Sequence, residues 1–187
     1  MGMNKILLIT ITLLAFNVFA CKTNEQDILK IDKITALDTI YTPDSLSQAG
    51  FKKNKTYNVD DLPKADSAYF GWKEIDSEGP KDFEVRIYKS HEDAVTFGRS
   101  YAEEAAGKDA VIRKGDASWK EGVKDRRIMV GGSTGASGKG GGAPTGSKSA
   151  PKYGDYIIYG NLIILCEGRS VEQSIERCSI FIRDINK

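Results

Sequence analysis

Hydrophobic and polar residues alternate in two stretches of the chain, over 68–73 and over 83–88. A period of two is typical of a strand with one buried face, so both stretches are predicted to be strands. The residues between them, 76–82, include Gly79 and Pro80, which suit a turn. The pattern therefore predicts a hairpin with a loop over 76–82.

Two apolar runs near the C-terminus, 156–159 and 162–165, predict a second hairpin. Only Gly160 and Asn161 lie between them, and both residues tolerate the positive φ angles of a two-residue loop. The runs are apolar on both faces, which is typical of strands in the middle of a sheet. A further short strand is predicted over 56–59.

A helix start signal lies at Thr42. Its side chain can cap a helix, Pro43 suits the first helical position, and Gly50 is a stop signal. The predicted helix covers 43–49.

Each predicted hairpin is followed by a capped helix. Ser90 opens one helix that ends at Gly107, and Ser170 opens the last helix of the chain. Each of these helices has one apolar stripe that can cover a sheet. The stripe residues are Ala94, Phe97, Tyr101 and Ala105 in the first helix, and Val171, Ile175, Cys178, Ile182 and Ile185 in the last.

These elements predict an α+β domain over residues 39–187. We expect an antiparallel sheet of about five strands with helices mainly on one face. The order strand, strand, helix occurs twice, which suggests two related halves. Between the halves the pattern is ambiguous, and it is compatible with strands over 111–112 and 128–130 and a helical turn over 118–124.

Two stretches between the halves bear on function. Basic residues outnumber acidic ones over 108–127, the stretch that contains Trp119. This stretch is either a binding patch for an anionic ligand or a solvated face with a half-buried tryptophan. Residues 131–154 are rich in Gly, Ser and Lys and have little to bury, which predicts a flexible loop, with a lid over a ligand as the functional alternative. The glycine spacing there does not match a phosphate-binding loop.

The N-terminus has the three parts of a secretory signal. Lys5 gives the positive start, an uncharged and mostly apolar run follows over 6–19, and small Ala20 precedes Cys21. The run is shorter than the roughly 20 residues that a membrane-spanning helix needs. We therefore expect an exported protein whose signal, residues 1–20, is removed.

The tetrapeptide Val18-Phe19-Ala20-Cys21 resembles the lipobox of bacterial lipoproteins. The resemblance implies that the thiol of Cys21 carries lipid and that acyl chains hold the protein on a membrane. The alternative is an ordinary signal peptide that ends beside a cysteine. Residues 21–38 are then expected to be a polar tether, or in part a short helix, and the mature domain resembles no family that we identify.

The cysteines predict one disulfide. Of the three in the chain, Cys166 and Cys178 remain as a pair once Cys21 carries lipid. Cys166 ends a predicted strand and Cys178 lies on the inner stripe of the last helix, so their positions agree with a bond between them. A free nucleophilic thiol is the alternative.

Other candidate chemistry is sparse. Glu74, Asp76 and Glu78 are spaced like the start of a calcium-binding EF-hand loop, but Val85 stands where the closing glutamate is needed. His91 is the only histidine, and it lies in the first turn of a predicted helix. We therefore expect no catalytic residues, no metal and no cofactor.

The net charge and the signal-like N-terminus together indicate a protein of the cell envelope. Removal of residues 1–20 takes away one charged residue, Lys5, and leaves no net charge, so nucleic acid is not an expected partner. We expect a lipid-anchored protein on the extracytoplasmic face of the cell membrane or outer membrane. It would act as a non-catalytic binding or accessory module, with the membrane and an envelope protein or small ligand as partners. The alternatives are an envelope hydrolase that uses Asp, Glu and Ser from separate strands, and a structural spacer.

Overall fold

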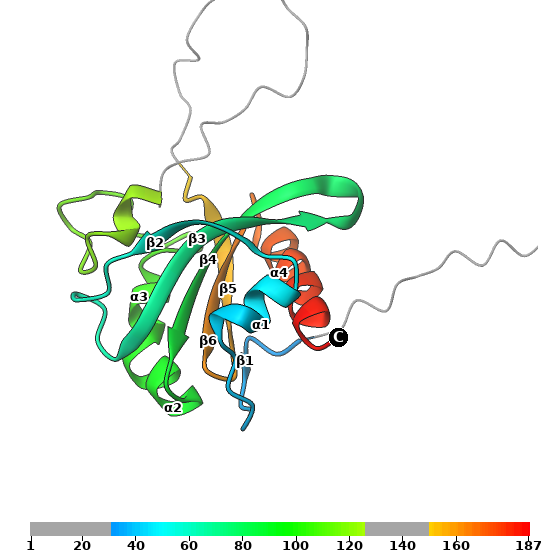
Figure 1. The fold of residues 1–187 in the computed structure, drawn as a ribbon. Coiled ribbons are helices and arrows are strands. Elements are labelled where there is room, and N and C mark those ends of the chain that lie inside the picture. Colours follow the sequence, from blue (N-terminus) through cyan, green and yellow to red (C-terminus); the bar gives the residue numbers. More distant parts are fainter. Residues whose placement is uncertain (1–30, 126–149) are drawn as a thin grey trace, which may run out of the picture.

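The computed structural model describes residues 31–125 and 150–187. It shows a six-stranded sheet with helices on both faces (Figure 1). The predicted signal peptide, the predicted lipid site Cys21 and the predicted strand over 128–130 lie outside the described residues, as does most of the loop predicted over 131–154.

The strands follow the order β1-β5-β6-β4-β3-β2 across the sheet. Their bounds are Ile34–Thr35 for β1, Lys52–Tyr57 for β2, Ala65–Ile75 for β3, Gly79–Tyr88 for β4, Tyr153–Tyr159 for β5 and Leu162–Glu167 for β6. Neighbouring strands are antiparallel except β1 and β5, which are parallel. The domain is α+β as predicted, but its sheet is mixed and has one more strand than expected.

The additional strand, β1, comes from the segment predicted to be a tether. The amide of Ile158 in β5 donates to the carbonyl of Lys33 at 2.8 Å, so this segment lies along the sheet edge. Ile31 and Leu37 pack against the core. The tether and the short-helix alternative are therefore both wrong for residues 31–38. The local pattern cannot show that these scattered apolar residues meet a sheet edge formed more than a hundred residues later.

The hairpin of β5 and β6 lies inside the sheet, as predicted. Gly160 and Asn161 form its two-residue loop, with Gly160 at a φ of 54°. On β6, Ile164 belongs to one core cluster and its neighbour Ile163 to another, so both faces of the hairpin are buried. β5 begins at Tyr153, within the stretch predicted to be a loop.

Helices cover both faces of the sheet, which corrects the prediction that they lie mainly on one. They are α1 Pro43–Gln48, α2 His91–Asp93, the π-helical turn η2 Ala94–Gly98, α3 Arg99–Glu103 and α4 Val171–Ile185. α1 and α4 pack on the face that contains Ile164, whereas the continuous segment α2-η2-α3 packs on the face that contains Ile163 (Figure 1). Both predicted strand-strand-helix units exist, with their helices on opposite faces.

The π-helical turn changes which residues of the α2-η2-α3 segment are buried. Ala94 and Ala102 are fully buried, whereas Phe97, predicted to lie on the inner stripe, is 37% exposed. A π turn inserts an extra residue and so rotates the following residues around the helix axis. Gly98 lies so close to β4 that an added Cβ would be 2.3 Å from the hydroxyl of Tyr88.

The hairpin of β3 and β4 is longer than predicted, because the loop expected over 76–82 is only a 3-10 turn, Asp76–Glu78 (η1). The tip lies beside α4 (Figure 1), and two of its exposed carboxylates form ion pairs with arginines of that helix. Arg177 forms a salt bridge with Glu78, and Arg183 lies 3.6 Å from Asp76. Residues 79–82 continue as paired strand because they pair directly with residues 72–75 of β3.

Trp119 is fully buried, not half-buried as predicted. Its ring packs edge-on against Tyr57 at 5.5 Å and under the guanidinium of Arg86 at 4.6 Å. Its indole N–H donates to the carbonyl of Asn58 at 3.1 Å. The strand predicted over 111–112 is not formed, and the helical turn is a short 3-10 helix, Gly122–Asp125 (η3).

Asn161 ties the N-terminal segment to the centre of the sheet. Its side chain is fully buried, and its Oδ1 accepts from the amide of Tyr41 at 2.8 Å. Its Nδ2 donates to the carbonyls of Tyr41 at 3.0 Å and Tyr88 at 2.8 Å. The residue expected only to form a turn therefore also fixes the chain that leads into α1.

Replacement of Asn161 by Ala should lower the free energy of unfolding by about 3 kcal/mol. It would leave buried backbone groups of Tyr41 and Tyr88 without partners, and each such group costs about 1–3 kcal/mol. Urea unfolding of the two proteins measures the difference. The matched control is Asn54→Ala, at an exposed position, which should change stability little. Equal effects at the two positions would contradict the role of Asn161.

Candidate functional site

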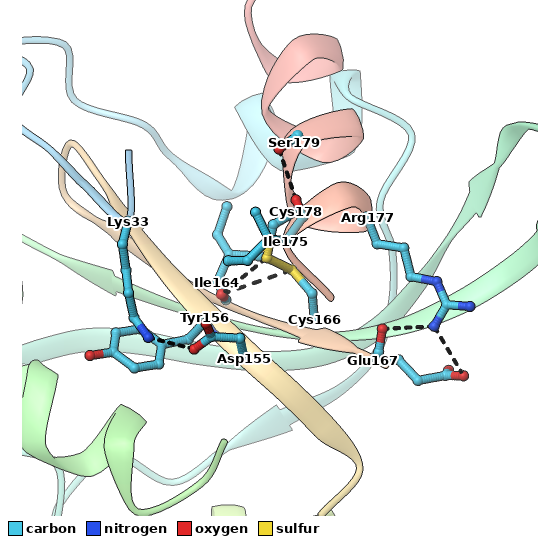
Figure 2. The surroundings of a disulfide bond; sticks show 10 residues. All are labelled: Lys33, Asp155, Tyr156, Ile164, Cys166, Glu167, Ile175, Arg177, Cys178 and Ser179. Carbon is cyan, nitrogen blue, oxygen red and sulfur yellow. Dashed lines mark hydrogen bonds and ion pairs between the residues drawn. A yellow bond between two sulfur atoms is a disulfide. The ribbon is translucent and has the colours of Figure 1, made fainter. Parts of the chain in front are cut away.

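The predicted disulfide between Cys166 and Cys178 is present, with an S–S distance of 1.99 Å and a Cα–Cα distance of 5.7 Å. Figure 2 shows that it joins the end of β6 to α4, with Ile164 and Ile175 beside it. Both cysteines are fully buried in the core. The pair therefore cross-links the sheet and its covering helix, and it offers no exposed thiol for nucleophilic chemistry.

A cleft lies between α1 and the edge strand β2, with a volume of about 390 Å³. Leu46 of α1, Phe51 before β2 and Tyr69 of β3 are almost fully buried and give it an apolar floor. Its remaining lining residues, mostly exposed, are Pro43, Asp44, Ser47, Lys52 and Lys53. We refer to these eight residues as the α1–β2 cleft.

The helix that forms one wall of this cleft is held at both ends. At its start, Thr42 and Ser45 form a capping box, and Pro43 occupies the first turn as predicted. At its end, the buried ammonium of Lys73 donates to the carbonyl of Ala49 at 2.7 Å and lies 2.8 Å from Asp184 of α4. A cation at a helix C-terminus is stabilising, so Lys73 both caps α1 and links it to α4.

The floor of the cleft depends on a glycine in β3. The ring of Phe51 lies against Gly71, where an added Cβ would be 2.6 Å from the ring. On its other side Phe51 stacks on Phe181 of α4, with ring centroids 5.7 Å apart. The sequence pattern gives no sign of this cleft, because periodicity does not show how α1 packs beside β2 and β3.

Lysines line the edge strand beside the cleft. Lys53 lies over the ring of Tyr69 at 5.0 Å, and Lys52 lies over the ring of Trp72 at 4.8 Å. Among the described residues neither lysine forms a salt bridge, whereas Lys55 lies 3.6 Å from Glu121. A register shift between Lys53 and Lys55 marks a bulge. The edge is therefore positively charged and incompletely neutralised.

A second groove, of about 560 Å³, lies between residues 36–40 and the start of α2 and contains the only histidine. Ring nitrogen Nδ1 of His91 lies 2.9 Å from the carbonyl of Gly160. The hydroxyl of Ser90 accepts from the amide of Asp93 at 3.0 Å as the helix cap. Both polar groups thus have structural partners, and they are not arranged as a nucleophile and its base.

Two of the carboxylates that are spaced like the start of an EF-hand loop form ion pairs. Asp76 and Glu78 face the arginines of α4, as described above. Within residues 31–125 and 150–187, no cluster of three His, Cys, Asp or Glu side chains could hold a metal ion. In the same residues, no helix combines the length and hydrophobicity needed to cross a bilayer.

A buried ion pair lies on the other face of the sheet. Glu84 and Arg86 of β4 are both fully buried, with 2.7 Å between carboxylate and guanidinium. The alternation of β4 predicted them on the solvent side, but the α2-η2-α3 segment and Trp119 cover that side. Burial is also the largest influence on neighbouring Tyr88, and it raises the pKa of this phenol to about 12.

Asp184 anchors the cation cluster that supports the cleft. Burial on its own raises the pKa of this carboxyl. Hydrogen bonds from Lys187, Lys73 and Arg183 act in the opposite direction and outweigh it, so the pKa of Asp184 is lowered to about 2. The carboxylate therefore stays ionised and contributes to structure over the whole neutral range.

The sequence of the domain matches a family model. The model of a family of unknown function, DUF6810, matches residues 42–187, and the chain belongs to this family. The match begins at the N-cap of α1 and leaves β1 outside it. No curated protein and no solved structure matches the chain.

Asp184→Asn should weaken the acid sensitivity of folding. The pKa of the folded carboxyl, about 2, lies below its ordinary value of 3.8. The ionised group therefore stabilises the fold above about pH 4, and this contribution is lost as the pH falls from about 4 towards 2. Urea unfolding at pH 7, 4 and 2.5 should show a smaller decline for the variant than for the parent protein.

Asp66 of β3 provides the matched control for this measurement, because it is exposed and forms no ion pair with any described residue. Asp66→Asn should retain the acid decline of the parent protein. If Asp184→Asn declines as steeply as the parent, the cation cluster does not contribute in the way described.

Proposed function

We propose that the chain is a lipid-anchored extracytoplasmic protein whose domain acts as a non-catalytic binding or accessory module of the cell envelope. The observation that carries the proposal is the disulfide between Cys166 and Cys178. Disulfides of this kind are typical of oxidising compartments outside the cytosol. The proposal joins this observation to the signal-like N-terminus and the lipobox resemblance that ends at Cys21.

The distance between anchor and domain supports a role near a membrane surface. Residue 31, where the described chain begins, is ten positions after Cys21 (31 − 21). A fully extended chain spans at most about 3.5 Å per residue, so about 35 Å separates the lipid from the domain at most. The domain would meet partners that reach the same surface.

The polar chemistry of the domain favours binding over hydrolysis. A hydrolase of the kind considered would use a carboxyl whose pKa is raised. Two carboxyls of the domain have pKa values shifted in the opposite direction: hydrogen bonds lower the pKa of Glu172 at the start of α4, and hydrogen bonds within its cation cluster lower the pKa of Asp184. The α1–β2 cleft, with its buried apolar floor, is the feature best suited to hold a ligand.

Cys21→Ser should release the protein from the membrane fraction of a bacterial host. The serine hydroxyl cannot take the thioether-linked lipid, and without acyl chains no stable anchor remains. Fractionation and immunoblotting measure the distribution. Thr23→Ser, two residues further on, is the control and should stay in the membrane fraction. Persistent attachment of Cys21→Ser would overturn the lipid-anchor proposal.

Export should also determine whether Cys166 and Cys178 are oxidised to a disulfide or remain as free thiols. In the denatured but unreduced full-length protein, a maleimide polymer should label neither Cys166 nor Cys178, because both are in the disulfide. A chain expressed without residues 1–20 stays in the reducing cytosol and should be labelled at both, and also at Cys21, which carries no lipid there. Gel shifts report the number of labels, with fully reduced protein as the reference. Two labels on the full-length chain would contradict export to an oxidising compartment.

A further inference from the structure

One edge of the sheet is open in the described part of the chain. β2 is the last strand in the order and pairs only with β3. The outer side of such a strand presents unpaired backbone N–H and C=O groups. α1 and its cleft lie directly beside this edge. A groove between an edge strand and a helix is a geometry in which an extended peptide can bind, by adding a strand and placing alternate side chains in pockets.

The charges of this edge define the kind of peptide. β2 begins with the residues Lys52, Lys53, Asn54 and Lys55. Successive side chains of a strand point to opposite faces, and the two rings below these lysines agree with this: Lys53 lies over Tyr69 at the cleft, and Lys52 over Trp72. An added strand would therefore meet an unneutralised lysine on each of its faces. Acidic side chains opposite these lysines are favourable.

The same charges argue against a second copy of this chain on the edge. Two β2 strands paired with each other would place lysines near lysines, and like charges opposite one another are destabilising. The cleft adds a further requirement, because its floor of Leu46, Phe51 and Tyr69 is apolar. The favoured occupant therefore combines acidic residues with one apolar side chain.

We propose that the α1–β2 cleft and the adjoining edge of β2 bind an extended acidic segment of another envelope protein, with one apolar side chain of that segment inserted in the cleft. This inference rests on the proposed function, of which it names the partner class. The bulge at Asn54 interrupts the edge, and the amide of Phe51 already donates to the carbonyl of Leu46, so the paired backbone is the part beside the cleft, Lys52 and Lys53. A short contact of this kind suits a partner that is also brought close by the membrane anchor.

Lysines on an edge strand also have a protective use, since they prevent unwanted pairing between sheets. The two explanations make different predictions. Protection requires only that the edge carries charge, and it gives the cleft no role. Recognition of an acidic segment requires both Lys53 and an open cleft.

The test uses the soluble full-length chain with Cys21→Ser and a panel of fluorescent eight-residue peptides. Each peptide alternates Glu and Thr around one central position, which is Leu, Ile, Val or Phe, and a matched panel carries Lys in place of Glu. Fluorescence anisotropy at moderate salt should show binding of at least one acidic peptide and of none of the basic ones. Amide hydrogen exchange over 52–53 should slow when that peptide is bound, because an added strand would protect backbone groups before the bulge.

Variants of the chain separate recognition from general charge. Lys53→Glu should weaken binding about tenfold or more, because it places like charges together. Ser47→Trp, at an exposed position of α1 that lines the cleft, should weaken binding by filling the pocket. Lys114→Glu makes the same charge change at a distant exposed site and should leave binding within about twofold. Circular dichroism verifies that each variant is folded.

Several outcomes would overturn the inference. They are the absence of binding by every acidic peptide, equal losses in Lys53→Glu and Lys114→Glu, or an unchanged affinity in Ser47→Trp. If Lys53→Glu weakens binding to phosphatidylglycerol vesicles more than binding to any peptide, the edge binds lipid headgroups instead. A dimer in sedimentation that Lys53→Glu abolishes would assign it to a second copy. If these tests fail while Cys21→Ser still leaves the membrane, the partner class is wrong and the lipid anchor stands.

Discussion

The hairpin of β5 and β6 is apolar on both faces, and each face has to be removed from water by a different element. α4 and α1 cover the face that contains Ile164, and the α2-η2-α3 segment covers the face that contains Ile163. This double burial sets the rest of the architecture. The disulfide ties α4 to the strand that it covers. Gly98 lets the second cover approach closely enough to pack on β4 and β6.

Hydrogen bonds of buried polar side chains fix the positions of segments that hydrophobic packing alone does not define. Asn161 satisfies backbone groups of two neighbouring segments at the closed end of the hairpin. Lys73 joins the end of α1 to Asp184 of α4. An unpaired buried polar group costs free energy, so the atoms in these contacts cannot move far apart without destabilising the fold. The α1–β2 cleft, which lies next to the Lys73 contact, is therefore held in shape even though its wall is a single short helix. A preformed site of this kind loses less conformational freedom on binding than a mobile loop would.

Local signals predicted much of this fold. The caps at Thr42, Ser90 and Ser170, the two-residue loop at Gly160 and Asn161, and the disulfide were all readable, because each depends on residues close in sequence or on cysteine parity. The predictions that were wrong concern contacts between segments. Residues 31–38 looked like a tether, and the tip of the β3–β4 hairpin looked like a loop. Residues 31–38 instead run along β5, a strand far along the chain, whereas residues 79–82 of the hairpin pair with its own first strand. The cleft left no sequence signal because periodicity does not show how a short helix packs beside the strand that follows it.

The sequence by itself determined the helix caps, the two hairpins, the central position of the last hairpin and the pairing of the two C-terminal cysteines. It also supplied the lipobox resemblance, which lies outside the described residues. Only the tertiary structure decided that helices cover both faces, that Glu84, Arg86 and Trp119 are buried, and that α1 and β2 enclose a cleft. The reason is physical. Periodicity records whether a residue is suited to burial, whereas the identity of the covering element depends on which segments the folded chain brings together.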